Sequence, residues 1–214
     1  MSLSVKRDYR SELRTAQARE TRRSIVSAAS RLFVENGYGA TTIDAIADTA
    51  GVSRKTVFTA VGGKLELLKT ALDWAVAGDD RPVALADRRA MRQVLEERDP
   101  TTLITRWVRI AVEIDTRVAR LFRAVEVAAG IDAAARELVE QSQRQRLDGA
   151  RTIVKRLAAL EALTTALTRD EAIDMAWLAT DPALFDRLVL VRGWSTGRFE
   201  EWLGLTLCGQ LLRA

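Results

Sequence analysis

Hydrophobic residues recur at helical spacing along most of the chain. Between residues 25 and 33, apolar side chains fall at i, i+3, i+4, i+7 and i+8, which places them on one face of a helix. The segments between the three prolines keep helical spacing and do not alternate apolar with polar residues as half-buried strands do. The pattern therefore predicts an all-α fold of about nine or ten helices.

Glycines and capping residues divide the first third of the chain into short helices. Glycine readily adopts the left-handed conformation in which many helices end, and a Ser or Thr side chain often caps a helix start. The expected stops and caps, in chain order, are Asn36-Gly37, Thr41 or Thr42, Gly51, Ser53, Gly62-Gly63, Lys64 and Gly78. These residues predict four helices, of which the fourth runs from Lys64 to near Gly78.

Longer helices are expected beyond Pro82. We predict them over roughly residues 84–98, 101–117, 117–129, 132–163, 168–180 and 195–213. At the other end of the chain, residues 1–18 alternate charged with small residues and carry no apolar face, so we expect a flexible arm there.

Three residues match the spacing of a helix-turn-helix. Such a unit needs a small residue where its helices cross, a glycine in the turn four residues later, and a branched apolar residue six further on. Ala47, Gly51 and Val57 meet this spacing. An ordinary αα-hairpin also contains small residues and glycines, so these positions alone leave both interpretations open. The helix-turn-helix interpretation places the third helix in the DNA major groove, with Arg54 and Lys55 near its start.

Positive charge is concentrated in the same part of the chain. The formal net charge is only +4, but the first 65 residues hold eleven Lys and Arg against six Asp and Glu. Arg22 and Arg23 precede the apolar face of the first helix, and Thr42 lies at a helix N-terminus, where unpaired N–H groups favour phosphate. These groups favour the DNA-binding interpretation.

The motif region resembles the DNA-binding signature of the TetR (tetracycline-repressor) family of transcriptional regulators. The resemblance is carried by Thr41 to Ala47, Gly51 to Phe58 and Gly63-Lys64, with closing segments at 187–188, 192–195 and 199–203. It implies an all-helical homodimer that binds double-stranded operator DNA as a repressor released by a small-molecule effector. It also divides the chain into an arm at 1–18, a helix-turn-helix domain at 19–64 and a ligand-binding and dimerisation domain at 65–214.

The resemblance assigns DNA contacts as well, placing Thr42, Lys55 and Lys64 on phosphates and the outward face of the third helix on bases. The full expected set is Arg22, Thr42, Ser53, Arg54, Lys55, Thr56, Phe58, Thr59 and Lys64. One segment departs from the family: Phe58-Thr59-Ala60 lacks the tyrosine hydroxyl and the imidazole that members often place on the DNA backbone. We interpret the departure as altered affinity or operator preference.

Aromatic residues in the central helices are candidates for an effector site. In similar proteins these helices enclose the inducer, so we expect Trp107 and Phe122 to line the ligand pocket. Packing in the core is the alternative for both. Arg106, Arg109 and Arg123 would suit an acidic ligand, although solvated helix faces explain them more simply.

The last helix carries an apolar stripe wider than one contact face requires, which favours two neighbours. Together with residues 170–180 it resembles the helix pair that builds the family's dimer interface. The expected interface residues are Ile173, Trp177, Phe199, Trp202, Leu203, Leu207 and Leu211.

Composition argues against other functional classes. The chain has no histidine, and its one cysteine, Cys208, lies in an apolar run. An internal disulfide is therefore impossible, and neither a metal site of the usual ligands nor a nucleophile–base pair is easily built. We expect no cofactor and no enzyme activity, and we interpret Asp79-Asp80 as a solvated turn. The start of the chain lacks a signal-peptide pattern and no uncharged stretch would span a bilayer, so we expect a cytoplasmic protein without a membrane partner.

Two alternatives remain open from the sequence. The unusual segment at residues 58–60 also suits a helical interaction module of the same fold that has weak or no specific affinity for DNA. An enzyme that uses only carboxylates as acids and bases is the other alternative.

Overall fold

The computed structural model describes residues 3–213, with side chains from residue 13 onward. Within that range the chain forms ten α-helices and no strands, which confirms the all-α prediction. The helices are α1 Leu3–Ala40, α2 Ile43–Ala50, α3 Arg54–Ala60, α4 Lys64–Ala77, α5 Arg89–Glu96, α6 Pro100–Ala129, α7 Ala133–Ala159, α8 Arg169–Ala179, α9 Pro182–Phe185 and α10 Thr196–Leu211. None of these helices has an apolar stretch of the length needed to cross a bilayer.

Local signals set the boundaries of α2, α3 and α4. Thr42 caps α2 by accepting a hydrogen bond from the backbone N–H of Ala45, and Ser53 caps α3 in the same way through Thr56. Gly51 ends α2 with φ 67°, a conformation that other residues adopt at a cost. The bounds of α2, α3 and α4 confirm the predicted starts and stops of these helices.

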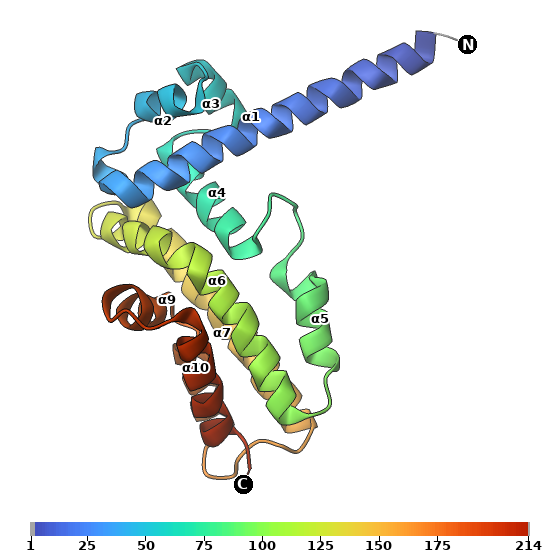
Figure 1. The fold of residues 1–214 in the computed structure, drawn as a ribbon, viewed down its shortest axis with the longest axis vertical. Helices are drawn as coiled ribbons and strands as arrows, with labels where there is room; N and C mark the ends of the chain where they lie inside the picture. Colours follow the sequence, from blue (N-terminus) through green and yellow to red (C-terminus); the bar gives the residue numbers. More distant parts are fainter. Residues whose placement is uncertain (1–2, 214) are drawn as a thin grey trace.

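The N-terminal segment differs from its prediction. Residues 1–18 were expected to form a flexible arm, but α1 is helical from Leu3. Figure 1 shows its first half extending well beyond the other helices. No glycine or proline occurs before Gly37, and Arg, Glu, Ala and Leu in this stretch favour helix. The helix changes direction at Gly37, where φ is 76°, close to the expected stop.

Helices α6 and α7 form the centre of the body and lie side by side over most of their length (Figure 1). The sequence predicted a break near Arg117, whereas α6 is one helix from Pro100 to Ala129. Asp99 caps its start, and no glycine or proline interrupts it before Gly130. A second difference is the segment after α8, where α9 and a π-helical stretch, Asp186–Val191, were not predicted. Asp181 caps the start of α9 by accepting a hydrogen bond from the backbone N–H of Ala183.

Two hydrophobic cores lie along α6. The upper core joins α1, α2, α3 and α4 to the end of α6 and the start of α7, and includes Phe33, Val57 and Phe122. The lower core joins α6, α7, α8 and α10 and includes Trp107 and Phe199. Helix α6 contributes to both cores and packs directly on α1 and α4.

Candidate nucleic-acid interface

The corner between α2 and α3 has the geometry that the helix-turn-helix spacing requires. Ala47 is buried where the two helices meet, Gly51 is left-handed, and Val57 is fully buried beneath α3. The backbone N–H of Val52 donates to the carbonyl of Ala47 at 3.0 Å, which closes the turn. Ser24 on α1 donates to the carbonyl of Ala50 at 3.4 Å, so α1 supports the end of α2.

With Val57 fixed in the core, the opposite face of α3 is exposed. Arg54, Lys55, Phe58 and Thr59 lie on this face, and 47% of the Phe58 side chain is accessible. Ser53 and Thr56 differ from these four because their hydroxyl groups are hydrogen-bonded to each other at 2.8 Å within the helix cap. The four exposed residues of the predicted set therefore share one face of α3. Ser53 and Thr56, which belong to the same set, also cap the start of this helix.

Arg54 already has a partner in the protein. Its guanidinium forms an ion pair with Asp44 on α2 at 3.0 Å and lies 5.8 Å from the centre of the Phe58 ring. Both charged side chains are more than half exposed, so the pair contributes little to stability and can exchange partners. Asp44 was not among the predicted site residues, because nothing in the sequence marks a pair that forms between two different helices.

The expected phosphate-binding residues lie at helix starts. Thr42 is exposed and its oxygen accepts the capping hydrogen bond, so its hydroxyl hydrogen remains available to an acceptor. Lys64 donates to the carbonyl of Gly39 at 3.1 Å, and its ammonium nitrogen lies 4.4 Å from the centre of the Tyr38 ring. Desolvation in this half-buried position lowers the pKa of Lys64. Thr41, in contrast, is buried and donates to two carbonyl groups of α1. Its role is therefore to stabilise the end of α1.

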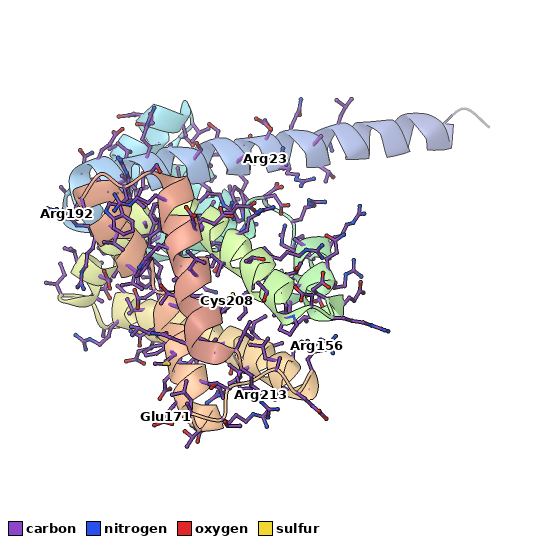
Figure 2. All side chains as sticks on the ribbon, turned by 60° about the horizontal axis from the view of Figure 1, so that its bottom comes forward. Arg23, Arg156, Glu171, Arg192, Cys208 and Arg213 are labelled. Atoms are coloured by element: carbon purple, nitrogen blue, oxygen red, sulfur yellow. The ribbon has the colours of Figure 1, made fainter. Side chains whose placement is uncertain are left out.

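The basic residues of α1 divide into two groups. Arg22 is exposed, with its guanidinium 5.9 Å from the centre of the Trp74 ring on α4. Arg19 and Arg23 both bind the carboxylate of Asp80 through two hydrogen bonds each. Figure 2 shows Arg23 on α1. The two arginines hold the pKa of Asp80 well below its usual range. The interpretation of Asp79-Asp80 as a solvated turn was therefore wrong, because Asp80 ties the chain after α4 to α1.

Comparison with known proteins finds relatives of the N-terminal helices. Residues 25–71 match the family model of the bacterial regulatory proteins of the tetR family, a range that contains the whole α2–α3 corner. This part of the chain is therefore similar to the DNA-binding region of tetR-family regulators. The uncharacterised HTH-type transcriptional regulator TtgW of Pseudomonas putida is 46% identical over 57 residues, which are 27% of this chain and 42% of TtgW. The match thus spans less than half of that relative.

Solved structures of other regulators share the fold over nearly the whole chain. NalD of Pseudomonas aeruginosa, the secondary repressor of the MexAB-OprM multidrug efflux pump, is 21% identical with a TM-score of 0.66, over 91% of this chain and 98% of NalD. A regulator from Saccharomonospora viridis, solved in complex with choline, is 19% identical with a TM-score of 0.68, over 91% of this chain and 99% of that one. At these identities the likeness establishes the fold.

In the body, the predicted pocket residues do not lie together. Trp107 is buried in the lower core and Phe122 in the upper core, and they are separated by about four turns of α6. Both side chains pack against neighbouring helices, with 5% and 4% exposure. The structure thus favours the alternative interpretation of each as a core residue.

The predicted dimer residues fall into two sets. Those buried inside the protomer are Phe199, Leu203, Leu207 and Leu211. Those that are partly or largely accessible are Ile173, Trp177 and Trp202. The first set packs against the helices of the same chain, so it is not available to a second copy. The sequence stripe on α10 was wide because α10 packs against both α6 and α8. Cys208, labelled on α10 in Figure 2, is half-buried beside this core.

An accessible stripe does exist on α10, and it includes Trp202 of the predicted set. Trp202 and Leu205 are 36% and 69% exposed, and Gly209 continues the same face one turn later. The amphipathic pattern alone did not separate this stripe from the buried one, because both contain large apolar residues.

Proposed function

We propose that the chain is a DNA-binding transcriptional regulator of the tetR family that represses transcription until a small-molecule effector releases it from a near-palindromic operator. The observation that carries the proposal is the outward face of α3, where Arg54, Lys55 and Phe58 are exposed above a fully buried Val57. A helix held on its apolar side and exposed on its polar side fits the major groove.

Phosphate contacts would position this helix on the duplex. Lys55 and Thr42 are exposed at the starts of α3 and α2, and Lys64 lies at the start of α4. Each start leaves backbone N–H groups that favour an anion. In the complex, Arg54 would leave Asp44 for a base edge, which the exposure of that ion pair makes inexpensive.

Dimerisation follows from the shortness of α3. Its seven residues reach only a few base pairs, so selection of one site in a genome requires a second copy and a two-fold symmetric operator. We place the interface on α8 and α10, with Trp202 and Leu205 as the exposed apolar contacts. The buried residues of the predicted interface then hold α10 against the other helices of the same protomer.

The effector would act on α4 through α6. Arg117 of α6 donates to the carbonyl groups of Ala75 and Val76 at 2.7 and 3.2 Å, so it holds the C-terminal end of α4. Helix α1 also packs on α6, which gives the body a second route to the DNA-binding helices. NalD represses an efflux pump, and the Saccharomonospora neighbour holds choline, which supports a ligand-responsive body here.

The remaining assignments follow from this role. We place the DNA-binding domain at residues 19–64 and the effector and dimerisation domain at 65–214, with the upper core shared between them. No cofactor and no catalysis are needed for DNA binding regulated by a ligand. The role requires the compartment that holds the genome, which is the cytoplasm of a bacterium.

Selection of DNA fragments by the purified protein tests the proposal. Genomic fragments are incubated with the full chain, retained complexes are sequenced, and protected bases are mapped by footprinting. We expect a few enriched fragments that share a nearly palindromic site. Retention of fragments without a common site would instead support the helical interaction module.

A further inference from the structure

A buried carboxyl group without a partner lies near the middle of α6. Asp115 is 3% exposed, and its Oδ2 makes no hydrogen bond within the described residues. Burying a polar group without a partner is costly, and native proteins seldom retain such a group without a reason. Desolvation raises the pKa of Asp115 to about 8, an effect that Arg146 opposes and Asp181 reinforces. The carboxyl group is therefore mostly protonated at neutral pH.

Three further helices bring polar groups to the same region. Arg146 of α7 donates to the carbonyl of Thr180 at 3.0 Å and to the carboxylate of Asp181, the α9 cap, at 2.9 Å. Its guanidinium also lies 5.5 Å from the centre of the Trp177 ring on α8. Buried nitrogens of Arg146 (Nε) and Trp177 (Nε1) have no acceptor among the described residues. Unsatisfied polar atoms thus cluster where α6, α7, α8 and α9 meet.

The charges in this cluster are unevenly matched. Arg146 is committed to Asp181, with side chains only 14% and 27% exposed. Asp115 has no ion pair among the described residues, although Arg146 and Asp181 both act on it electrostatically. Ionisation of Asp115 would therefore add a negative charge that Arg146, already paired with Asp181, does not neutralise. A group that enters it and carries a positive charge would complete the balance.

We propose that Asp115 binds the ammonium group of a small organic amine, and that this amine is the effector of the regulator proposed above. The inference rests on that proposed function. As the ammonium group enters, the carboxyl group gives up its proton to solvent, and a buried ion pair forms in place of a neutral acid. Two residues further along α6, Arg117 holds the end of α4, so an amine that moves α6 also acts on the DNA-binding helices.

Proton release gives the site a signature in pH. Below a pKa of about 8, the ionised fraction of Asp115 rises about tenfold for each pH unit, and amine affinity should rise with it. The charged groups that act on Asp115 from neighbouring helices are Arg146 of α7 and Asp181 at the start of α9. A neutral or anionic ligand would not show this dependence.

Titration calorimetry of the full chain with three probes of similar shape tests the proposal. Benzylamine should bind about tenfold more tightly at pH 7 than at pH 6, and should release close to one proton, measured in two buffers of different ionisation enthalpy. Benzyl alcohol and benzoate should bind at least tenfold more weakly at pH 7. Asp115→Asn should lose at least tenfold in benzylamine affinity together with the pH dependence. Glu113→Gln, an exposed change on the same helix, should retain both.

Several results would overturn the assignment. These are equal binding of benzylamine and benzoate, binding without proton release by the unaltered chain, or unchanged amine affinity in a folded Asp115→Asn variant. The proton count of the unaltered chain decides the matter even if Asp115→Asn fails to fold. The proposed function fails separately: a chain that binds benzylamine at Asp115 but selects no operator retains the site and loses the regulatory role. A chain that selects an operator but does not bind amines retains the regulatory role and loses the proposed amine site.

Discussion

The DNA-binding helices expose their functional polar residues, whereas the body buries them. On α3, Arg54 and Lys55 are exposed and their support, Val57, is buried. In the body the arrangement is reversed, with Asp115 at 3% exposure and the Arg146 side chain at 14%. Exposed charges suit a large polyanion that approaches from solvent, whereas buried ones suit a small molecule enclosed by helices. The contrast indicates where each kind of partner is recognised.

The largest effect should come from breaking the apolar support of α10. Leu203 is 1% exposed, so Leu203→Glu buries a charge without a partner and should cost about 4 kcal/mol or more, enough to unfold the chain. The matched change Leu205→Glu, at a position 69% exposed, should leave the protomer folded but prevent dimerisation. Circular dichroism and analytical ultracentrifugation distinguish the two variants. A folded Leu205→Glu dimer would show that α10 is not the interface.

A second test sharpens the contrast from inside the body. Because folding raises the pKa of Asp115 from 3.8 to about 8, stability is highest below the unfolded-state pKa and falls as the pH rises towards 8. Asp115→Asn removes this loss of stability. The free energy of unfolding of the variant should therefore exceed that of the unaltered chain by an amount that grows between pH 4 and pH 8, to a few kcal/mol at about 1.4 kcal/mol per pKa unit. Urea unfolding at several pH values measures it. A constant difference between the two chains would mean that Asp115 is not the titrating group.

A third test addresses the exposed face of α3. Arg54→Ala should cost about 1–3 kcal/mol of binding to the selected operator and relax preference at one base pair. Lys64→Ala should weaken all duplexes alike and lower the salt slope by about one. Competition binding against single-base operator variants measures both effects. Equal, sequence-independent losses would remove the base-reading role from Arg54.

The smallest expected effect concerns the connection between the two regions. Arg117→Ala removes two hydrogen bonds from α6 to the end of α4, and each typically contributes about 0.5–1.5 kcal/mol. We expect modest destabilisation and a weaker effect of benzylamine on operator affinity, measured by fluorescence anisotropy with and without the amine. Arg120→Ala, an exposed change one turn along α6, is the control and should respond as the unaltered chain does. An undiminished response in Arg117→Ala would exclude this connection.

How far the sequence predicted the structure also differs between the regions. Boundaries of the short helices depend on local chemistry, such as the Ser53 cap and the left-handed Gly51, and the sequence predicted them closely. The outward face of α3 followed from the position of Val57. Where a feature depends on neighbours along the chain, propensity and periodicity suffice.

Features that depend on distant neighbours were not predicted. Periodicity marked Leu203 as apolar but did not indicate whether it faces α6 or a second copy. Asp115 was not selected at all, because a single acid within a helix is usually solvated, and only the packing of α7 and α9 encloses it. Asp80 was misinterpreted for the same reason, since its partners Arg19 and Arg23 are some sixty residues away.

The most direct test of the central claim, that the exposed face of α3 recognises a specific DNA sequence, is the ratio of affinities for the selected operator and for a scrambled duplex of the same length. Fluorescence anisotropy at several salt concentrations gives both values. We predict a ratio of about 1,000 or more at physiological salt, with both affinities falling as salt increases. Equal affinities for the two duplexes at every salt concentration would contradict sequence recognition by α3.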